Sequence, residues 1–189
     1  MDSLVSVIVA VYNLGEDLDT GLRKQTLREL EIICVDDGST DNSLEILRRH
    51  AAEDSRIIVR QQKNQGAGPA RNNALSAATG KYVVFMDGDD LYPADDTLEK
   101  MVNAAKEHKV RVVAGYRSML RDGSALPDKS DPLYETALKN PGGILLKYSD
   151  IQFDFNYQCY LYERSIITEN GLEFPDYRRF QDPPFFVKA

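Results

Sequence analysis

Several residue types are scarce in this chain of 189 residues, and each scarcity argues against a class of protein. There is no tryptophan, and there are two cysteines and two histidines. Cys34 and Cys159 lack metal-ligand spacing, and His50 and His108 lie among charges on helix-like segments, which disfavours a zinc enzyme. Two reduced thiols in the cytoplasm are the simplest interpretation, because disulfides are rare there.

Long apolar runs and an excess of positive charge are also missing. The longest apolar run, Leu4–Tyr12, is far shorter than a membrane-spanning helix, and Met1-Asp2-Ser3 lacks the basic start of a signal peptide. The net charge of −7 disfavours a nucleic-acid partner. An acidic protein still binds an anionic nucleotide when a metal ion and backbone amides offset the repulsion.

The first half of the chain alternates short apolar runs with longer amphipathic segments. Strands are expected at Val5–Tyr12, Glu31–Val35, Arg56–Arg60 and Tyr82–Met86. Helices are expected at about Asp17–Leu27, from an Asp41 or Asn42 cap to about Glu53, and from Pro69 to about Ala78. This succession predicts an α/β fold, a right-handed, doubly wound, mostly parallel sheet flanked by helices.

The second half is less regular. A helix is expected at Thr97–His108, strands at Val110–Gly115 and Tyr157–Tyr162, and a short helix at Glu163–Asn170, closed by Gly171. Residues 117–150 show no clear pattern. Phe185–Ala189 follows directly on what looks like a helix start, so we expect the natural protein to continue.

Polar and glycine-rich residues follow each of the first four expected strands. Ligands of such sheets bind at the carboxyl ends of the strands, so these residues predict one site along one edge. Polar loops occur in any α/β domain, but that does not explain why two of the four carry paired carboxylates. The four segments are Tyr12-Asn13, Asp36-Asp37-Gly38, Gln61–Gly68 and Asp87-Gly88-Asp89-Asp90.

The run Asp87–Asp90 is a candidate metal and diphosphate site. Clustered carboxylates repel one another unless a cation is present, and hard oxygen ligands suit Mg²⁺ or Mn²⁺. Gly88 would let a phosphate or ribose approach closely. The alternative is an Asp-rich turn that caps the following helix.

Two further segments suggest contacts with a nucleotide. A carboxylate of Asp36 or Asp37 can accept the N–H of a uracil-type base, and the ring of Tyr12 can stack on the base; the alternative for Tyr12 is an aromatic residue at the core boundary. The loop with Gly66 runs into a helix whose N-terminus attracts anions, and Arg71 can reach a phosphate oxygen. A surface arginine is the alternative for Arg71.

Asp182 precedes Pro183-Pro184 near the end of the chain. This is the position of a helix N-cap. A fixed carboxylate near the sheet edge would also be able to take a proton from an acceptor hydroxyl. Both interpretations stand at the level of the sequence.

These motifs, with Val5–Asn13, Val35–Asp41, Asn64–Asn73 and Asp87–Asp90 in this order, strongly resemble glycosyltransferase family 2. The resemblance covers Leu4 to about Met101 and resumes at Arg178–Ala189. It implies the A-type nucleotide-sugar fold in a single domain, with residues 1–90 as the nucleotide-binding half and 91–189 as the acceptor-side half. Gln181 departs from the glutamate that often precedes the family's base.

The resemblance also implies a role for each site residue. Asp37, with Asp36 as partner, is similar to the uracil-binding carboxylate, and Tyr12 to the residue that packs on the base. Arg71 is similar to the arginine that faces the donor nucleotide. Asp87 and Asp89 are similar to the D-x-D pair that holds ribose and metal. Asp90 is similar to an aspartate that lies near the donor sugar. Asp182 is similar to the general base.

The implied function is inverting transfer of a sugar from a nucleoside-diphosphate donor, with Mn²⁺ or Mg²⁺, to a saccharide or lipid-linked acceptor. A fragment that binds nucleotide sugar without transferring it is the alternative. The part of the protein beyond residue 189 is a candidate for acceptor contacts or for peripheral contact with the inner face of the membrane. The glycine motifs of a dehydrogenase and of a P-loop NTPase are missing from this chain, which argues against both classes. The glycine- and arginine-rich loop that follows the first strand of a sugar nucleotidyltransferase is missing as well.

Overall fold

The computed structural model describes residues 3–15, 24–115, 118–121, 124–129, 133–140, 142–147 and 159–177. The described strands are β1 (Val5–Val11), β2 (Leu30–Asp36), β3 (Ile57–Gln61), β4 (Tyr82–Asp87), β5 (Val112–Ala114), β6 (Ser118–Arg121), β7 (Ser124–Pro127) and β8 (Tyr160–Glu163). The described helices are α1 (Ser43–Glu53), α2 (Ala67–Leu75), α3 (Thr97–His108), α4 (Tyr134–Lys139) and α6 (Arg164–Glu169).

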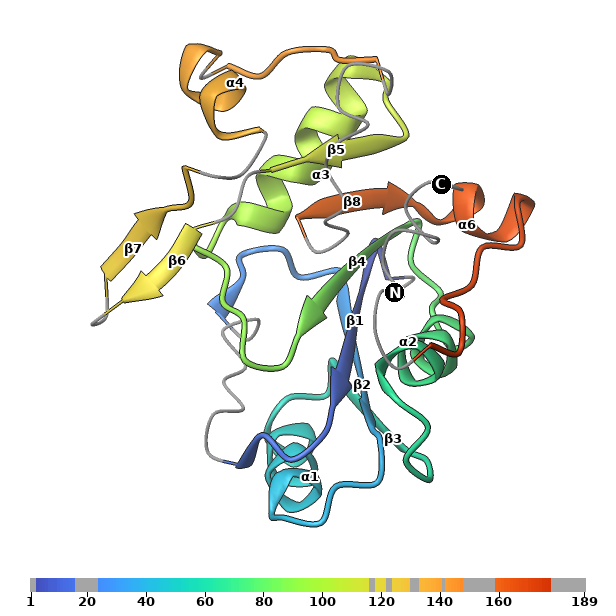
Figure 1. Ribbon diagram of the computed structural model, residues 1–189. Coiled ribbons are helices and arrows are strands. Elements are labelled where there is room, and N and C mark those ends of the chain that lie inside the picture. Colours follow the sequence, from blue (N-terminus) through green and yellow to red (C-terminus); the bar gives the residue numbers. More distant parts are fainter. Residues whose placement is uncertain are drawn as a thin grey trace.

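One large sheet organises the described part of the chain. Its strand order is β3-β2-β1-β4-β8-β5, while β6 and β7 form a separate antiparallel pair that stands apart from it (Figure 1). The pairs β1–β2, β1–β4 and β2–β3 are all parallel. The predicted α/β class with a mostly parallel sheet is therefore confirmed.

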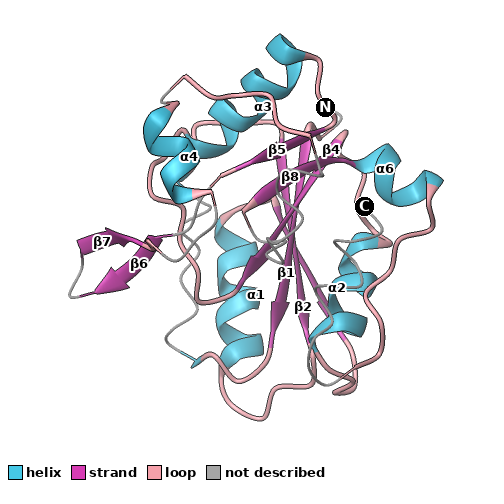
Figure 2. Cartoon of the chain, turned by 45° about the horizontal axis from the view of Figure 1, so that its top comes forward, coloured by secondary structure: helices cyan, strands magenta, loops and turns pink. Residues whose placement is uncertain are grey.

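The central strands are buried on both faces because their apolar residues are continuous rather than alternating. In β1, the odd positions from Val5 to Val11 belong to a core cluster that includes residues of α1 and α3. Ile8 belongs to the opposite cluster, which includes residues of α2 and α6. Figure 2 shows α1 and α2 on opposite sides of the sheet. The helices cover the two faces of the sheet and leave the ends of the strands uncovered. The end formed by the carboxyl termini of the parallel strands is called the carboxyl edge of the sheet below.

Of the two later strands of the sheet, β8 runs opposite to the first four, whereas β5 runs in their direction. β8 lies between β4 and β5 and pairs antiparallel with both. The expected strand at 110–115 is shorter than predicted, because α3 ends with Lys109 in the left-handed conformation (φ 54°) and Val110 N–H donates to Ala105 O at 3.1 Å. The segment 117–150, which showed no pattern, contains β6, β7 and α4.

The helix expected at about Asp17–Leu27 is not confirmed. Residues 16–23 lie outside the described residues, and 24–27 form no α-helix. Gln25 is instead buried against the start of α3: its Nε2 donates to Ala94 O at 2.8 Å, and its Oε1 accepts from Leu98 N–H at 3.1 Å. The side chain serves as a cap for another element, which local periodicity does not reveal.

Helix boundaries follow from local hydrogen bonds. Asn42 occupies the N-cap position of α1 without a side-chain cap bond, whereas Asp41 Oδ1 accepts from Ser43 N–H at 3.0 Å. The α2 helix ends at Leu75, earlier than the predicted Ala78, because Ala77 and Ala78 continue with tighter i→i−3 bonds. These shifts leave the predicted order of elements unchanged.

A buried glutamate joins three segments at the amino ends of the strands. The Glu31 carboxylate accepts hydrogen bonds from Ser6 Oγ–H, from Thr79 N–H at 2.7 Å and from Gly80 N–H at 3.1 Å. Burial by itself raises the pKa of Glu31, but these hydrogen bonds outweigh burial and hold the pKa below its ordinary value of 4.5. The charged form is therefore the form that stabilises the fold.

We expect Glu31→Gln to lower the free energy of unfolding at neutral pH by about 1–3 kcal/mol, because an amide replaces an acceptor oxygen with a donor facing other donors. The carboxylate, with its lowered folded-state pKa, stabilises above the unfolded-state pKa, and this contribution is lost as the pH falls through the folded-state pKa. The difference between the two proteins should shrink below about pH 4. Urea unfolding from pH 3 to 8 measures it, with exposed Glu107→Gln as control. A pH-independent difference would contradict the assignment.

Candidate functional site

The carboxyl ends of the parallel strands bring the predicted residues together at one edge of the sheet. In the strand register, Val11 pairs with Asp36, Ala10 pairs with Asp87, and Asp36 also pairs with Gln61. Tyr12 and the 62–66 loop follow directly after these positions. The sequence-based expectation of one shared edge is therefore confirmed for the described part of the site.

The Asp36-Asp37 turn lies inside this edge rather than on its surface. Asp36 is fully buried, and its carboxylate accepts long bonds from Ser39 N–H at 3.3 and 3.4 Å. Asp37 is 3% exposed. Asp37 Oδ1 accepts from Gln62 Nε2 at 2.8 Å and Gln65 N–H at 2.9 Å, and its Oδ2 accepts from Gly66 N–H at 2.7 Å. Asp37 thus holds the glycine loop against the end of β2, a role that the sequence did not reveal.

Glycines allow this close approach. Gly38 has φ of 71°, and a Cβ built there would lie 2.8 Å from Asn64 N, so a side chain would push the turn off the loop. Gly66 has φ of 98° and precedes the first residue of α2. Together they place the N-terminus of α2 beside the acidic turn, at the edge where β1 and β2 end.

Tyr12 is half-exposed, with 49% of its surface accessible, so its ring is available to a ligand at this edge. The next residue, Asn13, has a positive φ of 51° and is tied to the neighbouring turn. Its N–H donates to Ser39 Oγ at 3.0 Å, and its Oδ1 accepts from Thr40 N–H at 2.8 Å. Asn13, which the sequence reasoning did not single out, therefore sets the direction in which the chain leaves β1.

Arg71 is buried, so the alternative of a surface arginine is wrong. Its side chain projects from α2 and is 7% exposed. Arg71 Nη2 lies 2.8 Å from Asp87 Oδ1, and the guanidinium carbon lies 5.4 Å from the centre of the Phe174 ring. The charge of Arg71 is thus placed at the end of β4, next to the acidic run.

The acidic run forms a turn directly after β4. Asp90 N–H donates to Asp87 O at 3.1 Å, Gly88 is buried, and Asp89 and Asp90 are exposed. Among the described residues, no group of three or more His, Cys, Asp or Glu side chains could hold a metal ion. Mg²⁺ is usually bound by one or two carboxylates and substrate phosphates. The exposed carboxylates of Asp89 and Asp90 are accessible oxygen ligands of the kind that such a site uses.

Tyr92 is a neighbour of this turn that the sequence reasoning missed. Burial raises the pKa of Tyr92, and the nearby groups of Cys159 and Asp90 add to the effect. Cys159 directly precedes β8, so Tyr92 lies near a segment from the second half of the chain. In the sequence, the only sign that Tyr92 belongs to this site is its position two residues after the acidic run. Asp182, the predicted base, lies outside the described residues.

Both cysteines lie in the described part of the chain, and neither forms a disulfide. Burial raises the pKa of the Cys34 thiol to about 12, so this side chain stays protonated in the core at neutral pH. The described helices include none that is long and apolar enough to span a membrane.

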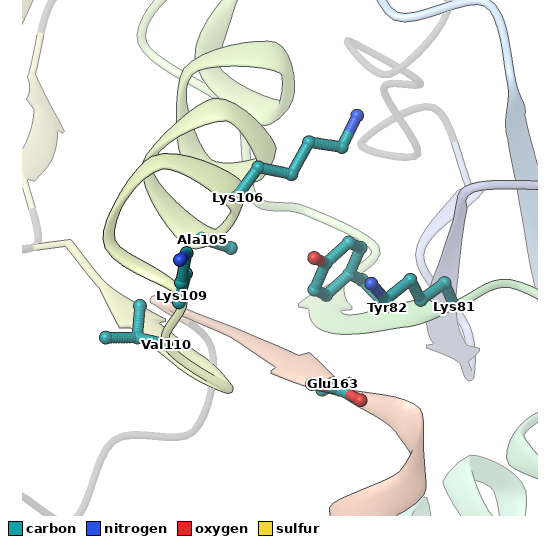
Figure 3. A pocket seen from close by; sticks show the side chains of 7 residues that line it. All are labelled: Lys81, Tyr82, Ala105, Lys106, Lys109, Val110 and Glu163. Atoms are coloured by element: carbon teal, nitrogen blue, oxygen red, sulfur yellow. The ribbon is translucent and has the colours of Figure 1, made fainter.

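A cavity of about 350 Å³ lies at the opposite end of β4 (Figure 3). Tyr82 and Glu163 contribute to it from the sheet, and Lys106 and Lys109 from the end of α3. Because Tyr82 begins β4 and Asp87 ends it, this cavity is separate from the edge that holds the acidic turns. Its three lysines, Lys81, Lys106 and Lys109, surround the C-terminus of a helix, where positive charge is ordinarily favourable.

Three known proteins show how this chain compares in sequence and in fold. The uncharacterized glycosyltransferase EpsJ of Bacillus subtilis is 33% identical over 195 residues, covering 100% of this chain and 56% of that protein. The poly(ribitol-phosphate) beta-glucosyltransferase of Bacillus spizizenii is 33% identical, covering 98% of this chain and 29% of that protein. The structure of S. aureus TarS 1–349 with UDP-GlcNAc superposes with a TM-score of 0.80 at 28% identity, covering 98% and 53% of the two chains.

The described part of the chain has the GT-A, nucleotide-sugar-binding fold. The model of glycosyl transferase family 2 matches residues 6–169, and the chain belongs to that family. The two relatives above are bacterial glycosyltransferases. The chain spans about half the length of the first curated relatives it matches.

Proposed function

We propose that this chain carries the donor site and the catalytic base for inverting transfer of a sugar from a UDP-sugar to a hydroxyl of a saccharide or lipid-linked acceptor. The observation that carries the proposal is the strand register, which places Asp36 and Asp87 beside the end of β1 on neighbouring strands. Family membership supports transfer. The binding of UDP-GlcNAc by S. aureus TarS supports a uridine donor.

The nucleoside would occupy the edge beside β1 and β2. The half-exposed ring of Tyr12 suits stacking on a base. In this proposal, a carboxylate of the buried Asp36-Asp37 turn would accept the uracil N–H. Asp37 already accepts three hydrogen bonds from the 62–66 loop. An ionised carboxylate accepts about four in all, so one further donor completes its shell. The position of the 62–66 loop and the binding of the base would therefore both depend on the Asp37 carboxylate.

The diphosphate would lie between the N-terminus of α2 and the acidic turn. Gly66 lets the backbone approach closely, and a helix N-terminus favours an anion. Arg71 supplies a buried positive charge beside Asp87. Asp89, with Asp87, would hold Mn²⁺ or Mg²⁺, and Asp90 would lie near the sugar. A bound divalent ion supplies stabilisation of the negative charge on the departing diphosphate.

In the proposed reaction, Asp182 accepts the proton of the acceptor hydroxyl while the hydroxyl oxygen of the acceptor attacks the anomeric carbon of the donor sugar. The new glycosidic C–O bond forms on the face opposite the bond to the diphosphate, which breaks with both electrons staying on the phosphate oxygen. One displacement inverts the anomeric centre and releases UDP. Arg71 and the amides at the start of α2 would stabilise the charge that develops on the leaving group.

A thermal-shift screen of nucleotide sugars with Mn²⁺ tests the donor site. A donor at 100 times its Kd stabilises by about 2.7 kcal/mol, or roughly 5–10 °C in Tm for a domain of this size. We expect shifts with UDP-sugars and not with dinucleotides such as NAD. Product analysis then separates the alternatives: UDP release with a glycosylated acceptor supports transfer, slow donor hydrolysis alone supports a binding fragment, and pyrophosphate release would reject the proposal.

A further inference from the structure

The side chain of Gln62 links the buried Asp37 carboxylate to α2. Gln62 directly follows β3, the strand at one side of the sheet (Figure 1), and its N–H donates to Asp36 O at 3.0 Å, which continues the pairing with β2. Gln62 Nε2 donates to Asp37 Oδ1 at 2.8 Å, and its Oε1 accepts from Asn73 Nδ2 at 2.7 Å. Three segments that are separate in the sequence therefore meet at one amide group.

The direction of these hydrogen bonds is fixed by the chemistry of the groups. A carboxylate accepts hydrogen bonds only, so the Gln62 amide must turn its Nε2 toward Asp37. Its Oε1 then points the other way and needs a donor, which the Nδ2 of Asn73 supplies. If either amide were turned round, two acceptors or two donors would face each other. The hydrogen-bond chain from Asn73 through Gln62 to Asp37 thus has one stable arrangement.

The α2 helix is held against this end of β3 at a second point. Arg60 Nη1 donates to Asn73 O at 2.9 Å and to Ser76 Oγ at 3.2 Å. Residues two apart on an extended segment lie on the same face, so Arg60 and Gln62 reach the same helix. The backbone and the side chain of Asn73 are therefore both bound from β3 and the residue that follows it, and the Gln62 amide is anchored to α2.

The hydrogen bonds on Asp37 are unevenly divided between its two oxygens. Oδ1 accepts from Gln62 Nε2 and from Gln65 N–H, whereas Oδ2 accepts from Gly66 N–H alone among the described residues. Each carboxylate oxygen accepts about two hydrogen bonds, so the remaining acceptor position is on Oδ2. The bond from Gln62 fills Oδ1 and sets the rotation of the carboxylate, which decides the oxygen that is left for a ligand.

We infer that Gln62 is a positioning residue for selection of the base: by donating to Asp37 Oδ1 from an anchor on α2, it leaves Asp37 Oδ2 to accept an N–H of uracil. The inference rests on the proposed function, in which the Asp36-Asp37 turn binds that base. Uracil presents an N–H between its two carbonyl groups, whereas the corresponding ring nitrogen of cytosine is an acceptor. A carboxylate oxygen held in one direction therefore rejects cytosine, and a carboxylate that rotates discriminates less.

Two substitutions separate this role from a purely structural one. Gln62→Met keeps the approximate size of the side chain but removes both hydrogen bonds. Gln62→Glu keeps the shape and the acceptor for Asn73, but it places a second carboxylate against Asp37, and like charges repel. If Gln62 only joined β3 to α2, the chain would tolerate Gln62→Glu better than Gln62→Met. If Gln62 orients Asp37, the chain tolerates Gln62→Glu worse.

The measurement is the affinity for UDP and for CDP, by calorimetry with Mn²⁺ near neutral pH and well below the Tm of each protein. Gln61→Met and Gln61→Glu are the matched controls. Gln61 is exposed at the end of β3, and successive strand positions face opposite sides, so the same changes there leave the bond to Asp37 in place. Gln61→Glu also measures the general effect of one added negative charge on nucleotide binding.

We expect Gln62→Met to lower the affinity for UDP at least about threefold and Gln62→Glu at least about tenfold, while the affinity for CDP changes less than about twofold. The Gln61 variants should change neither affinity by more than about twofold. Unchanged binding of UDP in both Gln62 variants, a milder effect of Gln62→Glu than of Gln62→Met, or an equal loss for UDP and CDP would each overturn the inference.

The unaltered chain separates the failure of this inference from the failure of the proposed function. If the unaltered chain binds no UDP, the proposed donor site is wrong and the role of Gln62 falls with it. If the unaltered chain prefers UDP to CDP and the Gln62 variants keep the same preference, the donor site stands and only the role of Gln62 is wrong.

Discussion

Replacing Asp182 by asparagine is expected to slow sugar transfer by about 10²–10⁴-fold without weakening donor binding, because that is the usual contribution of a general base. An aspartate whose pKa is unperturbed, near about 3.9, is ionised and able to accept a proton at neutral pH. Asparagine has the same shape but no comparable basicity. The loss should therefore fall on kcat.

The measurement is transfer rate at saturating UDP-sugar, together with calorimetry of the donor. Asp176→Asn is a suitable control, because Asp176 is an exposed aspartate shortly before the same segment. It should keep the normal rate. An Asp182→Asn protein that transfers sugar as fast as the unaltered chain would reject the assignment of the base and leave the helix-cap interpretation.

Asp89→Ala is expected to abolish the dependence of nucleotide binding on Mn²⁺. Asp89 is an exposed member of the turn after β4, so its removal should not disturb the core. Asp87 is a poorer choice, since its substitution would leave the buried Arg71 without the carboxylate that lies 2.8 Å away. Loss of the bound metal should lower the affinity for UDP in the presence of Mn²⁺ by at least about 100-fold. Changing a residue that only hydrogen-bonds to a metal ligand typically costs about 10–100-fold, and removing a ligand itself should cost more.

Calorimetry of UDP with and without Mn²⁺ gives the result. In the unaltered chain the metal should strengthen binding, whereas in Asp89→Ala the two titrations should coincide. The exposed Asp95, a few residues later, provides the control substitution Asp95→Ala, which should retain the effect of the metal. Equal affinity of Asp89→Ala and the unaltered chain with Mn²⁺ would contradict the metal site.

The first four strands were predictable because their signal is local. β1, β2 and β4 are mostly apolar without alternation, the pattern of strands covered on both faces, and polar residues stand at or directly after their carboxyl ends. α3 begins and ends at the predicted residues, Thr97 and His108, because its apolar positions recur with helical spacing. Parallel order at one edge follows from such units, which is why the acidic turns were expected to converge.

Contacts between distant segments were not predictable in the same way. The antiparallel insertion of β8 between β4 and β5 depends on pairing across many residues, and no local pattern encodes it. The role of Gln25 in capping α3 was likewise not predicted, since its bond partners lie about 70 residues away in the sequence. In both cases the partner lies far along the chain, so composition and spacing carry no information about it.

The sequence by itself determined the class of this protein: the first four strands, their shared edge, and the carboxylates of Asp36, Asp37, Asp87 and Asp89 at that edge. Only the tertiary structure decided what several side chains do there. It buried Arg71 between Asp87 and Phe174, turned Asp37 toward the glycine loop, and bound Asn72 to a backbone 102 residues away. The physical reason is that residue type and spacing specify a local conformation, whereas burial and hydrogen-bond partners exist only after distant segments have packed together.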